Sequence, residues 1–170
     1  PKNNKFQRSY YRFLAHQLML SNDKNIDGRV SDIISFLKTQ DFNDHLLINT
    51  QLSLIQYFLD RYSSIEAHKL LTMLENNNNY QKYIAKQREV GDNLVLTKIN
   101  LIKALLATTN NLRVQFCSNA IKAIAGTAKV NQSIKITYPL MQAHSCLNRV
   151  TEISEVKARL VKLGINNFQL

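Results

Sequence analysis

The chain has 170 residues, of which 45% are hydrophobic, 4 are Gly and 2 are Pro, and its formal net charge is +10. This length and hydrophobic content suffice for one ordinary domain and exclude a disordered tail, while the few Gly and Pro disfavour a β fold with many turns. No apolar run is long enough for a membrane span, and no secretion signal is visible. The start at Pro1 predicts a piece of a longer protein.

The first part of the chain predicts three helices, because apolar residues recur there at spacings of three and four. The first helix is expected over residues 6–20 and ends before a polar turn at 22–25. The second follows Asp27, which we expect to cap it. The third, over 43–62, is apolar on more than one side and is therefore expected to be the most buried.

Two shorter helices are predicted in the middle of the chain. The segment 63–66 reads Ser-Ser-Ile-Glu, a capping box that predicts the start of a fourth helix. This helix ends at the asparagine run 76–79, which is expected to be a loop. A fifth helix over 80–90 ends at Gly91, a residue suited to a left-handed helix end.

Four further helices complete the pattern. They are expected over 93–108, over 112–125 with an end at Gly126, from Pro139 to about residue 150, and from Thr151 to Gly164. Proline is placed at a helix start because it lacks the N–H that a helix interior needs.

Eight or nine helices joined by short polar turns predict an all-α fold. Short turns make consecutive helices antiparallel neighbours. We therefore expect a single domain over residues 1–170, built of antiparallel helical hairpins that form a short right-handed α-solenoid or an irregular helical bundle.

The charge is distributed unevenly, and this is the strongest functional signal in the sequence. From residue 93 to residue 151 there is no Asp or Glu, and the N-terminal segment also carries unopposed cations. Segregated positive charge attracts phosphate polyanions or an acidic protein.

Aromatic residues interleaved with cations can stack on unpaired bases. For Tyr10 and Phe13 the helical spacing favours the core, whereas Tyr11, Tyr80 and Tyr83 are expected to be exposed. The predicted nucleic-acid-binding residues are Lys98, Lys103, Arg113, Lys122, Lys129, Lys135, Tyr11, Arg12, Tyr80 and Tyr83.

The segment from Leu54 to Leu74 resembles the helical hairpin of the pentatricopeptide repeat family. Leu54 and Ile55 match the Leu-Ile of the family's first helix, and its second helix is matched by Glu66, Ala67, Leu70 and Leu71. The resemblance implies a helical repeat protein that binds single-stranded RNA, in an organelle such as the mitochondrion. The family's base-reading polar position is occupied by Leu52 and, in a second, fainter copy, by Ile99. A grip on the RNA backbone is therefore expected rather than base-by-base reading.

The sequence carries no pattern typical of catalysis. The four histidines are not at metal-ligand spacing, and each is interpreted as a satisfied core or surface residue: His16, His45, His68 and His144. No glycine-rich phosphate loop or nucleophile motif occurs. Cys117 and Cys146 are interpreted as buried, reduced thiols of an intracellular protein. No enzyme activity, cofactor, metal or small-molecule substrate is predicted.

Two functional hypotheses follow. The first is a non-catalytic module that grips single-stranded RNA through a basic face. The alternative is a protein-interaction scaffold that binds an acidic or amphipathic partner segment within a larger complex. A helix-turn-helix for duplex DNA, resting on residues 61–74, is less favoured because its second helix offers one Lys and no Arg or Gln for base edges.

Overall fold

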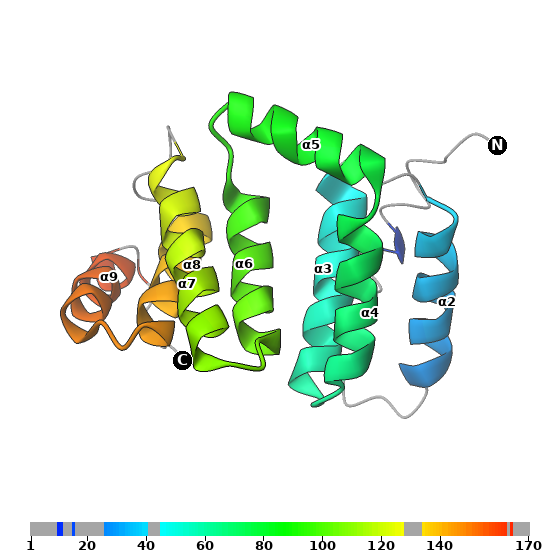
Figure 1. Ribbon diagram of the computed structural model, residues 1–170, viewed down its shortest axis with the longest axis horizontal. Coiled ribbons are helices and arrows are strands. Elements are labelled where there is room, and N and C mark those ends of the chain that lie inside the picture. The colour runs from blue at the N-terminus through cyan, green and yellow to red at the C-terminus, as the bar shows by residue number, and fades with distance from the viewer. Residues whose placement is uncertain are drawn as a thin grey trace. The chain divides into compact units, whose positions relative to one another are not determined.

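The computed structural model describes residues 10–11, 15, 26–40, 45–127, 134–162 and 164. In these residues it contains eight helices and no strand (Figure 1), which confirms the all-α prediction. The chain forms two compact units, residues 1–85 and 86–170, where the sequence suggests a single domain. Most of the helix predicted over 6–20 lies outside the described residues. None of the described helices has the length and apolar character that a membrane span requires.

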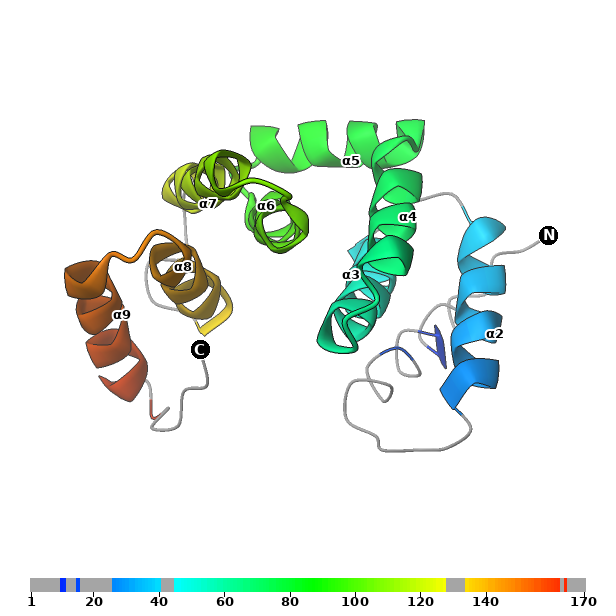
Figure 2. The same ribbon diagram turned by 60° about the horizontal axis from the view of Figure 1, so that its bottom comes forward.

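The first unit is built around a hairpin of two helices. Its described helices begin with α2 (Ile26–Lys38), α3 (His45–Asp60) and α4 (Ser64–Glu75). Figures 1 and 2 show α3 and α4 side by side, and α3 also contacts α2. As predicted, α3 is extensively buried, with Leu47, Ile48, Leu54 and Ile55 fully inside. Because α2 begins at Ile26, Asp27 lies within its first turn and is not its cap.

One buried amide links the two helices of this hairpin. Gln51 of α3 is completely buried, and its side-chain Nε2 donates a hydrogen bond of 2.6 Å to the backbone oxygen of Leu70 in α4. Its Oε1 has no partner within the described residues. The hydrogen bond fixes how α3 and α4 lie along each other, since a shift of one helix along the other would leave both polar atoms of a buried amide unsatisfied.

The helix starts of this unit use different capping groups from those that the sequence suggests. Helix α4 begins at Ser64 as the capping box predicts, but the Ser63 side chain makes no capping hydrogen bond. The predicted asparagine loop is shorter than expected, because α5 (Asn78–Glu89) begins inside it. There Asn77 is the cap, and its Oδ1 accepts hydrogen bonds from the backbone N–H groups of Asn79 and Tyr80.

The second unit packs four helices in sequence. Its elements after α5 are α6 (Leu94–Leu106), α7 (Asn110–Ala125), α8 (Ile134–Cys146) and α9 (Val150–Lys162). Helix α6 packs against α7 and α8, α7 packs against α8, and α8 packs against α9. Met141, Val156 and Leu160 form the core of the last pair. Asn110, expected in a turn, begins α7, because the side chain of Thr109 accepts a hydrogen bond from Leu112 N and caps the helix there.

Pro139 does not begin a helix, which corrects the sequence prediction. Helix α8 starts at Ile134 and contains Pro139 as its sixth residue. A proline at this position removes one backbone hydrogen bond and crowds the carbonyl four residues earlier. Pro139 is buried, and α8 contacts α6, α7 and α9. Tertiary packing of this helix therefore offsets the local cost of the proline. Helix α9 begins at Val150, so Thr151, expected at its start, is its second residue and not its cap.

Four helices are followed by a left-handed residue two positions after their last residue, and two of these residues are glycines, Gly91 after α5 and Gly164 after α9. Gly91 ends α5 as predicted, with a φ of 71°, and Asp92 N donates back to Gln87 O. The same pattern of hydrogen bonds ends α3 at Tyr62 and α8 at Asn148, with φ of 59° and 52°. Asn tolerates this conformation, whereas Tyr adopts it at a cost, because its Cβ crowds the backbone.

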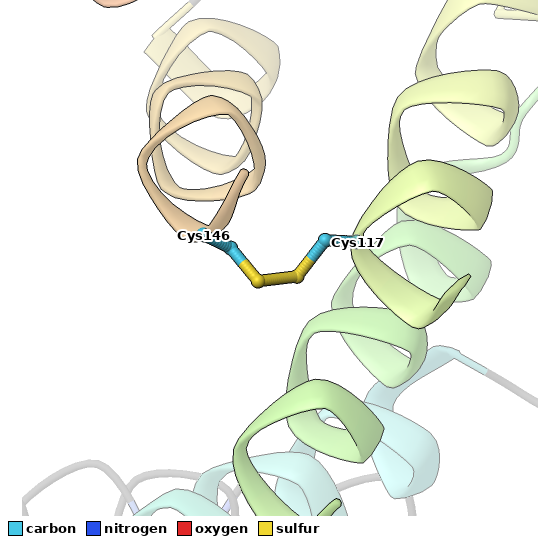
Figure 3. The surroundings of a disulfide bond; sticks show 2 residues. All are labelled: Cys117 and Cys146. Carbon is cyan, nitrogen blue, oxygen red and sulfur yellow. A yellow bond between two sulfur atoms is a disulfide. The ribbon is translucent and has the colours of Figure 1, made fainter. Parts of the chain in front are cut away.

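The two cysteines form a disulfide, which overturns the prediction of reduced thiols. Cys117 lies on the buried face of α7 and Cys146 is the last residue of α8 (Figure 3), and their Cα atoms are 6.2 Å apart. Because 29 positions separate the cysteines in sequence, spacing alone gave no sign of the pairing. Disulfides are typical of proteins that fold in an oxidising environment.

Replacing Tyr62 by Gly should stabilise the first unit by about 0.5 to 1 kcal/mol, because relief of the left-handed strain exceeds the added freedom of the unfolded chain. The ring is 96% exposed, so its removal loses no packing. The measurement is the midpoint of urea unfolding, compared between the native chain and the variant at an unchanged m-value. Tyr62→Ala is the matched control, since it removes the ring but keeps Cβ and should not stabilise. Equal gains from both variants would contradict the strain argument.

Reduction of the disulfide should destabilise the second unit. A disulfide that closes a loop of this length is expected to add about 3 to 4 kcal/mol to the free energy of unfolding. Dithiothreitol should therefore lower the thermal midpoint of the native chain and leave that of Cys117→Ala/Cys146→Ala unchanged. An unchanged midpoint for the native chain, in a sample shown by mass spectrometry to be reduced, would mean that the bond does not contribute to stability.

Candidate nucleic-acid interface

The two units differ strongly in charge. Residues 86–170 contain twelve Lys and Arg against four Asp and Glu, which gives the second unit a formal charge of +8 out of the chain's +10. Residues 1–85 contain ten cations against eight acids and carry only +2. The acid-free stretch predicted from the sequence spans α6, α7 and α8, all of which pack together in the second unit. The positive field is therefore a property of one compact body.

The predicted phosphate contacts differ in how available they are. Arg113 and Lys122 on α7 are exposed, and neither forms an ion pair with any residue that the structure describes. Lys98 and Lys103 on α6 are half-buried and already interact within the chain. Outside the described residues lie Lys129, Arg12 and the side chain of Lys135, whose backbone belongs to α8.

The available cations do not all lie on one side of α7. Arg113 and Lys122 are nine residues apart, which places them on opposite sides of a helix with 3.6 residues per turn. Arg113 lies one turn from Phe116, and the Lys103 ammonium is 5.6 Å from the centre of the Phe116 ring. Lys103 and Phe116 thus connect α6 with α7, one helical turn from Arg113. Phe116 was missed because its partner lies on another helix, a relation that no short motif encodes.

The predicted aromatic contacts need correction. Tyr80 is 3% exposed and belongs to the buried face of α5, so its ring has no free face for a base. Tyr11 is half-buried and stacks on Phe36, with ring centres 4.1 Å apart. Tyr10, assigned to the core from its spacing, is instead 50% exposed. Tyr83 is half-buried and already interacts within the chain, and Phe13 lies outside the described residues.

One histidine has an environment that the sequence did not suggest. His144 in α8 is buried, and its Nδ1 has no partner in the described part of the chain, so it is not the satisfied histidine that we expected. Burial lowers the pKa of its imidazole, opposed by the attraction of Glu152; Arg149 lowers the pKa further and Glu155 raises it. Across the described residues, no group of three or more His, Cys, Asp or Glu is placed to hold a metal ion.

No family model, curated protein or solved structure matches the chain. The functional argument therefore depends on the charge, exposure and contacts described above.

Acidification should destabilise the second unit through His144. A folded-state pKa below the unfolded value of about 6.5 means that the unfolded chain binds the proton more readily, so stability falls as the pH falls below that value. Urea unfolding measures the free energy of unfolding at pH 7.5 and at pH 5.5. Between these two pH values His144→Gln should lose less stability than the native chain. His68→Gln, an exposed position in the first unit, is the control and should lose as much stability as the native chain. Equal losses in all three would exclude this role for His144.

Proposed function

We propose that this chain is a non-catalytic module that binds single-stranded RNA through its second unit. The observation that carries the proposal is the formal charge of +8 on residues 86–170, with no acidic residue between residues 93 and 151. A cation that contacts a phosphate releases condensed counterions, and this release drives sequence-independent binding. Arg113 and Lys122 are exposed and have no acidic partner among the described residues, so they lose no ion pair there when they contact a phosphate.

The positions that resemble the pentatricopeptide repeat agree with a grip on the RNA backbone. Leu54, Ile55, Ala67, Leu70 and Leu71 are all buried, so the matching residues form the inside of the α3–α4 hairpin. At the positions where that family places base-reading polar residues, Leu52 and Ile99 are also buried. Neither side chain can contact a base, and the resemblance supports a helical hairpin architecture without that form of base reading.

A protein-interaction scaffold is the second candidate, and one specific observation favours it. Leu105 at the end of α6 is 62% exposed, and Leu112 and Val114 at the start of α7 are each 41% exposed. Arg113 lies among them in sequence. Apolar side chains beside a cation suit an amphipathic partner segment that carries acidic residues. Absence of RNA binding in the experiment below would favour this candidate.

Removing the two available cations should weaken RNA binding and reduce its salt dependence. Each phosphate contact adds roughly 0.7 to the slope of log affinity against log salt for a single strand, so Arg113→Gln/Lys122→Gln should lower the slope by about 0.7 to 1.4. The slope is measured by fluorescence anisotropy with a labelled single-stranded RNA at several salt concentrations. Single-stranded and duplex DNA of equal length test the preference for RNA.

The matched control is Lys38→Gln/Lys69→Gln, which removes the same charge from exposed positions of the first unit. It should leave the slope close to that of the native chain. Equal effects of the two double variants would show that net charge alone drives binding, and a flat salt dependence in the native chain would refute the proposal.

A further inference from the structure

The disulfide joins two pairs of helices within the second unit. Cys117 belongs to α7, which packs on α6, and Cys146 is the last residue of α8, which packs on α9. Among the described helices of this unit, α6 and α7 share the most extensive contact. The α8–α9 pair has a core of its own in Met141, Val156 and Leu160. The disulfide is therefore a covalent link between two helical pairs, in addition to their packing.

Helix α8 contains several features that oppose its own packing. Pro139 in its interior lacks the N–H that would complete the hydrogen bonding of the helix. Near the end of α8, His144 Nδ1 and Ser145 Oγ are buried and have no hydrogen-bond partner in the described part of the chain. A buried polar atom without a partner costs free energy, because water would bond to it if it were exposed. Tertiary contacts and the disulfide offset these costs.

The two unpartnered atoms lie directly beside the disulfide. His144 and Ser145 immediately precede Cys146, and all three residues belong to the last turn of α8. While Cys146 is bonded to α7, this turn stays tethered and cannot move far enough for water to reach both atoms. Once the bond is cut, hydration of the imidazole and of the hydroxyl favours departure of the turn. The disulfide thus opposes a local tendency of α8 to leave its neighbours.

The two cysteines differ in exposure, which determines where a thiol can attack. Cys117 is completely buried, whereas Cys146 is half-buried at the end of α8 (Figure 3). A thiolate from solvent therefore attacks the Cys146 sulfur and forms a mixed disulfide, while the Cys117 sulfur leaves with the bonding electron pair and takes up a proton. A second thiolate attacks the small-molecule sulfur of the mixed disulfide, which frees Cys146 as a thiol and yields a small-molecule disulfide.

We infer that the bond between Cys117 and Cys146 is a redox-sensitive latch that holds α8 against the hydration of its unpartnered polar atoms. Two molecules of a small thiol open the latch, and the α8–α9 pair then separates from α6 and α7. The α6–α7 pair stays folded, because its contact is the most extensive in the unit and contains neither Pro139 nor the unpartnered atoms of α8. The inference does not depend on the proposed RNA binding.

The latch is tested by hydrogen exchange with mass spectrometry on the full chain, before and after reduction with dithiothreitol. In the reduced chain the backbone amides of α8 and α9 should exchange at least about tenfold faster, because opening no longer has to occur within a closed loop. Amides of α6 should change by less than about threefold, and those of α3 should not change. Equal acceleration in α6 and α8, or no acceleration in α8, would overturn the inference.

Two further measurements check the chemistry of opening. Treatment with a limiting amount of glutathione should place the first adduct on Cys146, and mass spectrometry of peptides locates it. An adduct on Cys117 would contradict attack from the Cys146 side. The variant Cys117→Ala/Cys146→Ala should show fast exchange in α8 with and without dithiothreitol. Slow exchange in this variant would mean that α8 stays docked without the bond, and would overturn the latch.

Ser145→Ala tests the cause of the opening. It removes a buried hydroxyl that has no partner, so after reduction its α8 should exchange about fivefold more slowly than α8 of the reduced native chain. Ser154→Ala is the matched control, because it makes the same replacement on α9, where the Ser154 hydroxyl donates to Val150 O. It should leave α8 at the rate of the reduced native chain. Equal slowing in both variants would assign the effect to helix propensity and contradict the inference.

Discussion

The surface of the second unit depends on how α7 is packed. The helix buries Cys117 and two alanines, Ala120 and Ala123, against its neighbours α6 and α8. Small side chains allow close approach of helices, and the disulfide to Cys146 fixes the rotation of α7 about its own axis. A helix whose rotation is fixed on one side presents a defined set of residues on the other. Packing on α6 and α8 therefore determines which residues of α7 are exposed.

In the RNA binding that we propose, positive charge and neutral polar groups would act over different distances. The cations of the second unit attract a polyanion over distances of about a Debye length, and they act in the same way on every nucleotide sequence. Amides carry no net charge and act only at hydrogen-bond distance, where the pattern of donors and acceptors distinguishes the bases. The charges of the first unit nearly balance, with ten cations against eight acids.

The sequence predicted the elements of this fold better than its surfaces. Periodicity located the helices because each buries an apolar side, and Gly91 marked a helix end because its backbone conformation favours glycine. Pro139 misled the prediction, since α8 is held by neighbours that lie elsewhere in sequence. Tyr80 and Tyr11 were misplaced for the same reason, because one side chain of a helix faces the core or the solvent according to its tertiary partners. The pairing of Cys117 with Cys146 is likewise a tertiary property.

The disulfide also changes the covalent topology of the chain. Residues 117–146 become a closed ring that contains the second half of α7 and all of α8, with two tails attached to it. One tail leads back through α6, and the other enters α9 only four residues after Cys146. Cleavage of any single peptide bond within the ring leaves one connected molecule, whereas a cut in either tail releases a fragment. The basic segment that joins α7 to α8 can thus be cut once by a protease without separating the two helices that flank it.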